Sequence, residues 1–166
     1  MRKILFRGQT RKYGEKVRLN GEGTGMREII FRAKTLPNQK DVKTGKIIKK
    51  SKWVYGYIDL GYMHDCKVPL ISDEKGNNCY KCYYETIGQY TGLTDKNGKK
   101  IFEGDIVKRF WLGSEIIYCI KYEEENAHFI GEALNESGFT TFDCDGNEFE
   151  IIANIYDNPE LIKQEG

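Results

Sequence analysis

Short apolar runs separated by polar turns follow one another along most of this chain. In the segment 115–124 the apolar side chains of Ile116, Tyr118, Ile120 and Tyr122 recur in steps of two, the period of a β-strand. Further strands are expected at 3–6, 28–31, 53–62, 66–72, 79–84, 105–111, 127–134, 139–142 and 148–156. Between such runs lie the Asp-, Asn- and Gly-containing segments 73–77, 95–100 and 143–148, which are typical of tight turns. The pattern predicts an antiparallel meander.

The second half of this meander is expected to close into a small, strongly bent, SH3-like barrel. The motif GDIV at 104–107 places a turn glycine before β-branched residues, as strands that enter such barrels often do; this step is an analogy. No helical period of 3.6 is evident, but Pro159 after Asn158 predicts a short C-terminal helical turn. The predicted fold class is therefore mainly β. Gly56 within an apolar run predicts a bulge or a close backbone approach.

The first ten residues, MRKILFRGQT, are repeated in similar form as MREIIFRAKT at 26–35. We interpret residues 1–25 as a partial duplication or an N-terminal hairpin extension, and residues 26–166 as a single domain. Met26 is a candidate internal start. Whether residues 1–25 pack on the domain is left open by the sequence.

Charge is distributed unevenly along the 166 residues. Residues 1–52 hold 16 basic and 4 acidic side chains, whereas residues 53–166 hold 10 and 21, for the overall net charge of +1. This asymmetry indicates either a surface for nucleic acid or a basic segment that neutralises an acidic body. Charges at Arg2, Lys3 and Arg7 interrupt the first apolar stretch, and no apolar run reaches about 18 residues. We expect a cytoplasmic protein without a membrane segment, whose five cysteines are free thiols.

A basic insertion at 37–52 precedes an aromatic strand. Its lysines could contact phosphates and the aromatic rings could stack on bases. The candidate nucleic-acid-binding residues are Lys40, Lys43, Lys46, Lys49, Lys50, Lys52, Trp53 and Tyr55. The alternative is a solvated lysine loop beside aromatic side chains that belong to the core.

A weak zinc candidate combines His64 and Cys66 with the pair Cys79 and Cys82. Two thiolates in a C-x-x-C spacing can reach one tetrahedral ion. If 79–84 is a strand, however, residues three apart point to opposite faces and the site fails. Core or surface thiols are then expected. There is no G-x-S-x-G elbow, no P-loop and no G-x-G-x-x-G motif, so neither catalytic residues nor a cofactor are predicted.

Several segments together resemble the YopX family of bacteriophage and prophage proteins. They are MREIIFRAK (26–34), WVYGYI (53–58), TIGQYTGLTDKNGKKIFEGDIV (86–107) and ANIYDNPELI (153–162). The resemblance implies a small, mostly β protein and supplies no catalytic residue. Its motif residues are interpreted as fold determinants: Gly88, Tyr90, Gly92, Leu93, Asp95, Gly98, Gly104 and Asp105.

The functional expectation is a phage or prophage accessory protein without enzymatic activity. It would be an interaction module that binds a host or phage protein, with a homo-oligomer as one form of that role. The alternative is a nucleic-acid-binding protein that uses the basic residues 1–52.

Overall fold

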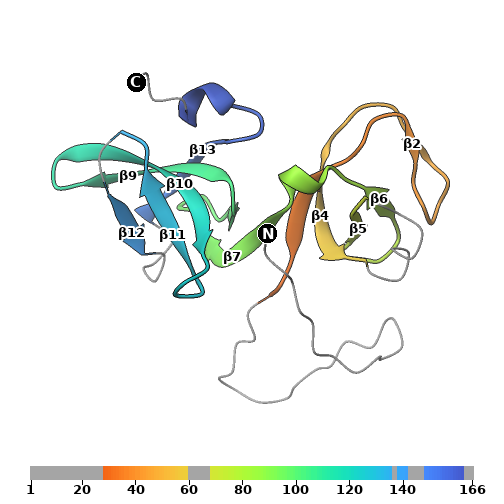
Figure 1. Ribbon diagram of the computed structural model, residues 1–166, viewed down its shortest axis with the longest axis horizontal. Helices are drawn as coiled ribbons and strands as arrows, with labels where there is room; N and C mark the ends of the chain where they lie inside the picture. The colour runs from red at the N-terminus through yellow and green to blue at the C-terminus, as the bar shows by residue number, and fades with distance from the viewer. Residues whose placement is uncertain (1–27, 60–67, 136–137, 142–147, 163–166) are drawn as a thin grey trace, which may run out of the picture.

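The computed structural model describes residues 28–59, 68–135, 138–141 and 148–162, and antiparallel sheets dominate them (Figure 1). A six-stranded sheet in the order β6-β5-β4-β1-β7-β8 contains β1 (Phe31–Lys34), β4 (Trp53–Ile58), β5 (Leu70–Asp73), β6 (Cys79–Lys81), β7 (Gly88–Thr94) and β8 (Lys100–Phe102). A five-stranded sheet in the order β12-β11-β10-β9-β13 contains β9 (Asp105–Trp111), β10 (Ser114–Glu123), β11 (His128–Ala133), β12 (Phe139–Thr141) and β13 (Glu150–Asn154). The small elements are the strand pair β2 (Gln39–Lys40) and β3 (Ile47–Ile48) and the 3₁₀ turns η1 (Tyr84–Thr86) and η3 (Pro159–Ile162).

The mainly β class predicted from the sequence is confirmed, whereas the closed barrel is wrong. Within the described residues the five-stranded sheet is open, because β12 and β13 lie at opposite edges and do not pair. The neighbouring strand β7, which the sequence did not predict, pairs with β1 and β8 in the other sheet. The GDIV motif does begin a strand, since β9 starts at Asp105, but a strand start does not decide which edges meet.

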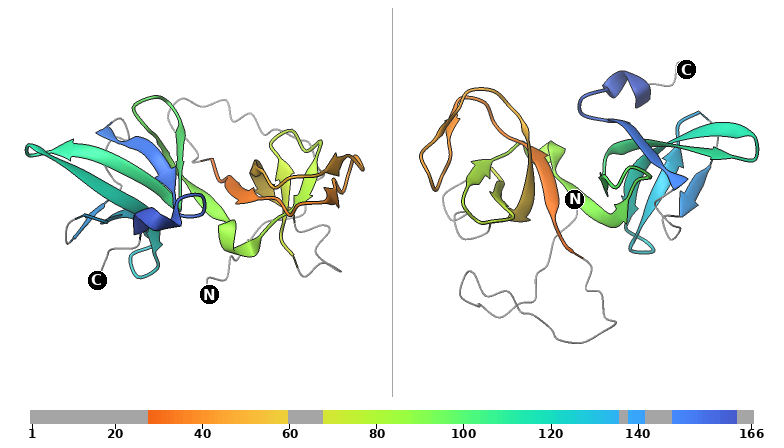
Figure 2. Two further views of the ribbon diagram at one scale, coloured as in Figure 1. Left: turned by 90° about the horizontal axis from the view of Figure 1, so that it is seen from above. Right: turned by 180° about the vertical axis from the view of Figure 1, so that it is seen from behind.

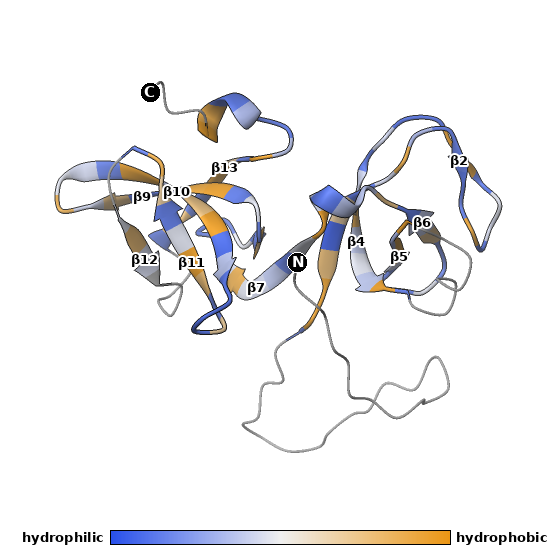
Figure 3. Cartoon of the chain, in the orientation of Figure 1, coloured by the Kyte–Doolittle hydropathy of each residue, from blue (hydrophilic) through white to orange (hydrophobic). Residues whose placement is uncertain are grey.

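The buried apolar side chains of the described residues form three clusters, one of which consists of Ile30, Tyr90 and Phe102. The five-stranded sheet packs around Val107, Tyr118, Ile120, Phe129 and Phe149, together with Ile101 from β8. The six-stranded sheet packs around Phe31, Ala33, Val54, Ile71 and Cys82. Figure 2 shows β7 running from one sheet toward the other, and Figure 3 shows hydrophobic and hydrophilic positions alternating along the strands. Because most apolar side chains are buried within these clusters, polar groups can occupy the surface between the two sheets.

Gly56 in β4 provides the close backbone approach that its place in an apolar run predicts. It pairs with Asp73 of β5 and has a φ of 154°, a conformation that side chains rarely allow. A Cβ at this position would lie 1.9 Å from the carbonyl oxygen of Ser72. Only glycine therefore lets β4 and β5 pair here. In the part of the chain that the structure describes, no helix has the length and hydropathy needed to cross a membrane.

Candidate functional site

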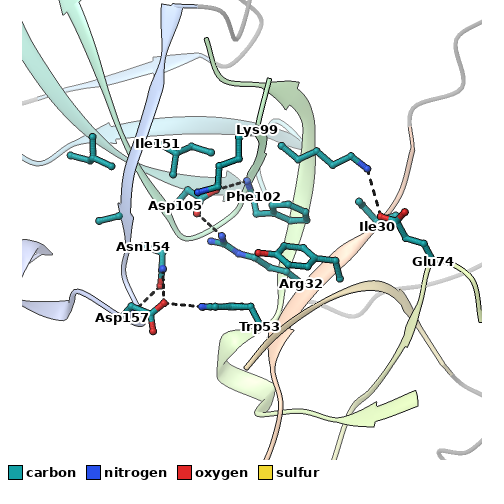
Figure 4. A pocket seen from close by; sticks show the side chains of 14 residues that line it. Ile30, Arg32, Trp53, Glu74, Lys99, Phe102, Asp105, Ile151, Asn154 and Asp157 are labelled. Atoms are coloured by element: carbon teal, nitrogen blue, oxygen red, sulfur yellow. Dashed lines mark hydrogen bonds and ion pairs between the residues drawn. The ribbon is translucent and has the colours of Figure 1, made fainter. Parts of the chain in front are cut away.

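A pocket of about 390 Å³ lies between the two sheets (Figure 4). Its lining contains aromatic and aliphatic side chains and also charged ones, of which three are cations and three are carboxylates. The charged groups are Arg32, Lys99, Lys100, Glu74, Asp105 and Asp157. The pocket is therefore close to neutral overall, with both signs of charge near apolar walls.

The strands β1 and β4 supply one wall of this pocket. Arg32 is paired with Tyr55 and Lys34 with Trp53 in the antiparallel register. Because side chains alternate along a strand, these four lie on one face, while the intervening residues enter the core of the six-stranded sheet. The alternation of the FRAK and WVYGYI segments thus determines which side chains face the second sheet.

A buried ion pair joins the two sheets at the base of the pocket. Arg32 Nη1 lies 2.5 Å from Asp105 Oδ1, and Arg32 Nη2 donates to the carbonyl oxygen of Glu103 at 3.1 Å. The backbone N–H of Phe102 donates to Asp105 Oδ2 at 2.8 Å. Burial raises the pKa of Asp105, and the neighbouring Arg32 opposes that rise. The ion pair is thus buried away from solvent, where removing either partner lowers the stability of the fold strongly.

Aromatic rings surround the guanidinium group of Arg32. Its Cζ lies 4.8 Å from the ring centroid of Trp53 and 5.2 Å from that of Phe102. The ring of Tyr55 in turn contacts Phe102, with 5.5 Å between centroids. Arg32 is only 5% exposed, and its buried Nε–H has no hydrogen-bond partner among the described residues. The pocket therefore contains a fixed cation within an aromatic wall.

Asp157 forms a second connection between the sheets. Its Oδ2 accepts hydrogen bonds from Trp53 Nε1 and Asn154 Nδ2, both at 2.8 Å, and its Oδ1 pairs with the ammonium of Lys34. Burial raises the pKa of Asp157, but these hydrogen bonds outweigh it and bring the pKa to about 2. Asp157 is therefore ionised at neutral pH and anchors the chain after β13 on β1 and β4.

The rim of the pocket carries two lysines from the segment before and within β8. Lys100 Nζ lies 2.8 Å from Glu28 Oε2 and 3.7 Å from Glu74 Oε1. The exposed Lys99 makes no ion pair with any described residue. Burial raises the pKa of Asp105, and the charge of Lys99 is among those that oppose this rise, so Lys99 faces Asp105 without forming an ion pair with it.

The predicted nucleic-acid residues do not all meet at one place. Trp53 and Tyr55 line the pocket, and Lys43 turns inward, with its ammonium 3.0 Å from the carbonyl oxygen of Gly76 and 3.9 Å from Asp59 Oδ2. The remaining lysines are exposed and make no ion pair within the described ranges. We call them the lysine surface: Lys40, Lys46, Lys49, Lys50 and Lys52. The basic insertion itself is a hairpin built on β2 and β3.

A second exposed feature is the end of the β9–β10 hairpin. Phe110 is 73% exposed and Leu112 is 90% exposed, and Trp111 lies between them. β11 first pairs with β10 at Tyr118, so the preceding turn and strand ends extend past the sheet, as Figures 1 and 2 show. We call Phe110, Trp111 and Leu112 the hairpin tip.

Cys79 and Cys82 lie in different surroundings. Cys79 Sγ is 3.8 Å from Asp59 Oδ2, in a buried polar group with Ser72, whereas Cys82 packs in the apolar core of the six-stranded sheet. Burial raises the pKa of Cys79 and raises that of Cys82 to about 12. The other two residues of the zinc candidate, His64 and Cys66, lie outside the described residues. Among the described residues no group of three or more potential metal ligands occurs.

The family-like residues from 88 to 105 lie around the crossing from one sheet to the other. Asp95 is buried and accepts hydrogen bonds from the backbone N–H groups of Asn97 and Lys99, both at 2.9 Å. Gly92, Gly98 and Gly104 have positive φ, and Gly88 and Gly104 are buried. Tyr90 is buried with Phe102, and Leu93 packs against the core of the five-stranded sheet. Asp105 is the partner of Arg32.

The order of these residues along the chain matches a known family. A family model described as YopX protein matches residues 31–163. The chain belongs to the YopX family. No significant match occurs among curated proteins. The matched range of this YopX protein includes both sheets, the inter-sheet pocket and the hairpin tip.

Sequence reasoning missed two features of this YopX protein. Arg32 was placed just beyond the expected strand 28–31, although a charged residue between the apolar residues Phe31 and Ala33 is itself a signal for a buried partner. The expected strand 105–111 ended within the run FWLG, and Leu112 was given no role. An apolar Leu112 directly before Gly113 in a hairpin turn was the available signal for an exposed apolar tip.

Proposed function

We propose that this YopX protein is a non-enzymatic accessory protein of a bacteriophage or prophage, acting in the cytoplasm of the bacterial host by binding a protein partner. The partner is a host or phage protein with a hydrophobic pocket on its surface, and the hairpin tip makes the main contact with that pocket. Apolar and aromatic anchors of this kind dominate protein interfaces when they enter a matching pocket.

The conformation of Leu112 carries this proposal. Leu112 has a φ of 48° and Gly113 a φ of 88°, as in a type I′ turn, where Asn-Gly is the favoured pair. A leucine in this left-handed region costs about 1–2 kcal/mol, and its exposed side chain recovers nothing by burial in the monomer. An apolar side chain held at a strained, exposed position supports a role in binding.

The charges beside the tip favour a protein over a polyanion. Lys108 Nζ lies 3.0 Å from Glu115 Oε2, and Arg109 Nη2 lies 2.8 Å from Glu148 Oε2. These cations are neutralised locally, so the base of the tip offers no spare charge to phosphates. The guanidinium of Arg109 also lies over the ring of Trp111, with 4.1 Å between Arg109 Cζ and the ring centroid. This contact orders the ring before binding, which lowers the entropy cost of association.

Immobilised wild-type protein is first used to capture partners from a host lysate. Each captured protein is then purified and titrated against wild type and the variants Leu112→Asn and Phe110→Ser, and its affinity for each is compared. Phe139→Ser removes an exposed ring of the same sheet and is the matched control. Tip variants should weaken binding of the captured protein by about tenfold or more, with the control unchanged. Equal binding by wild type and both tip variants would overturn the proposal.

A homo-oligomer would be one form of the same role. Light scattering at low and high salt tests for this oligomer. If the tip binds a second copy of the chain, the measured mass of wild type is twice that of the monomer, whereas Leu112→Asn stays a monomer. A monomer under both conditions assigns the tip to a different protein. An oligomer that persists in the tip variants would contradict the use of the tip for self-association.

A second candidate function is nucleic-acid binding by the lysine surface. Its support is that these exposed lysines have no carboxylate partner among the described residues, so their charge is available to phosphates. The variant Lys49→Gln/Lys50→Gln should weaken binding of single-stranded DNA or RNA and reduce the dependence of log affinity on log salt. If neither nucleic acid binds wild-type protein at low salt, this candidate fails.

A further inference from the structure

We propose that the inter-sheet pocket binds a planar aromatic anion with the chemistry of a nucleoside monophosphate. This goes beyond the hairpin tip and does not depend on it, because the pocket and the tip share no residue. The same chemistry is offered by a free mononucleotide and by the phosphorylated end of a nucleic-acid strand.

The aromatic wall suits a flat ring. Tyr55 contacts Phe102 on one side and is still 43% exposed, so part of its ring remains available inside the pocket. The ring of Trp53 is held in place by its hydrogen bond to Asp157 and by contact with the ring of Tyr156, with 5.7 Å between the two centroids. Rings held this way lose little freedom on binding, and each base stacked on an aromatic side chain contributes about 1–3 kcal/mol.

The rim suits an anion attached to that ring. Lys99 makes no ion pair with any described residue and extends into the pocket on the side of Asp105, whereas Lys100 extends toward Glu74 (Figure 4). The hydrogen bond that Lys100 donates to Glu28 raises the pKa of Lys100, which keeps its ammonium protonated. The Nε–H of Arg32 is unpaired but too deeply buried for a ligand to reach, so the rim lysines carry this part of the argument. An ammonium group favours ligands with acceptor oxygens, of which phosphate is the strongest case.

Size and charge balance restrict the ligand further. A volume of about 390 Å³ lies within the range of small-molecule sites. Glu28, Glu74 and Asp157 stand around the cations, so a continuous polyanion would meet repulsion on either side of them. A single phosphate avoids that repulsion, and Glu74 can accept a hydrogen bond from a base amino group or a sugar hydroxyl. The pocket therefore favours one nucleotide unit.

The two tryptophans provide the measurement. Trp53 lies in the pocket and Trp111 at the hairpin tip, so two-dimensional NMR of the indole N–H groups reports both places in one spectrum. Trp111→Phe assigns the signals. The full chain is titrated with AMP and UMP, with adenosine and inorganic phosphate as half-ligands, and with a 5′-phosphorylated trinucleotide.

The expected result is a saturable shift of the Trp53 signal by a mononucleotide or the trinucleotide, with Trp111 unmoved. Shifts by AMP or UMP assign the site to free nucleotides, and shifts by the trinucleotide alone assign it to strand ends. Lys99→Gln should weaken binding by about tenfold, because it removes a charged hydrogen-bond donor. Lys121→Gln, on the other sheet, should leave the affinity unchanged.

Several results would overturn the proposal. No shift of Trp53 up to millimolar ligand rules out the site. Equal shifts by adenosine and AMP remove the role of the anion, and equal affinity of wild type and Lys99→Gln removes the role of the rim. Protein binding by the hairpin tip is measured separately with Leu112→Asn and Phe110→Ser, so failure of the pocket proposal is distinguishable from failure of the proposed function.

Discussion

Arg32 of β1 and Asp105 of β9 form an ion pair that is buried between the two sheets. Each residue belongs to a different sheet, and each also bonds to the backbone of the 102–103 segment. The pair therefore fixes both the spacing of the sheets and the floor of the pocket.

Breaking this pair is expected to destabilise the protein strongly. Arg32→Met leaves the Asp105 carboxylate buried without its cation, and should lower the free energy of unfolding by about 3–5 kcal/mol. The double variant Arg32→Met/Asp105→Asn should cost less than the sum of the single variants, because no unpaired charge remains. Urea denaturation measures all three. The exposed pair Lys121–Glu132 is the control and should contribute less than about 1 kcal/mol.

The pKa of Asp157 predicts a stability change at low pH. Its pKa is lowered from the ordinary 3.8 to about 2 in the folded protein, so the unfolded chain takes up a proton first as the pH falls. The contribution of Asp157 is thus fully present above about pH 4 and is lost between there and pH 2. Asp157→Asn should be less stable than wild type at pH 6, with a gap that narrows through this window. A gap independent of pH would contradict the assignment.

Gly56 should not tolerate even a methyl group. Gly56→Ala places a Cβ against the carbonyl oxygen of Ser72 and should lower stability by more than about 2 kcal/mol. Gly45 also has a positive φ, but a Cβ at that position would meet no other atom within 4 Å. Gly45→Ala should therefore cost only about 1 kcal/mol. Thermal denaturation of the two variants separates the steric effect from the backbone effect, and equal losses would contradict it.

Leu112→Asn should make the isolated protein more stable. Asn adopts positive φ readily and forms the favoured Asn-Gly turn with Gly113, so a gain of about 1 kcal/mol is expected. Denaturation midpoints measure the gain. A loss of stability would mean that the leucine side chain supports the fold, which would weaken its assignment to binding.

Cys82 should resist alkylation in the folded protein. Burial raises the pKa of its thiol to about 12, so almost no thiolate is present at neutral pH. Iodoacetamide labelling followed by peptide mass spectrometry should modify Cys82 only after unfolding in urea. Rapid labelling of the native protein would show that this core opens readily.

The sequence by itself determined the β class, most of the strands and the family, because alternation, turn residues and motif order are local properties. It placed β9 at 105–111 and predicted a bulge or a close backbone approach at Gly56, of which the structure shows the close approach. It missed β7, whose GQYTGLT run alternates weakly and contains a glycine in a bulged register. Local pattern was insufficient there because the register shift between β7 and β8 breaks the alternation, and the other partner, β1, lies far away along the chain.

Only the tertiary structure decided how the sheets pair, close and meet. An Asp95 turn can be recognised from its own segment, but the joining of Arg32 to Asp105 and of Trp53 to Asp157 depends on pairs separated by 73 and 104 positions. The open edges of the five-stranded sheet, found in place of the expected barrel, also depend on strands that are far apart in the sequence. Alternation tells which side of a strand a residue occupies, whereas the identity of the opposing surface is determined by long-range packing.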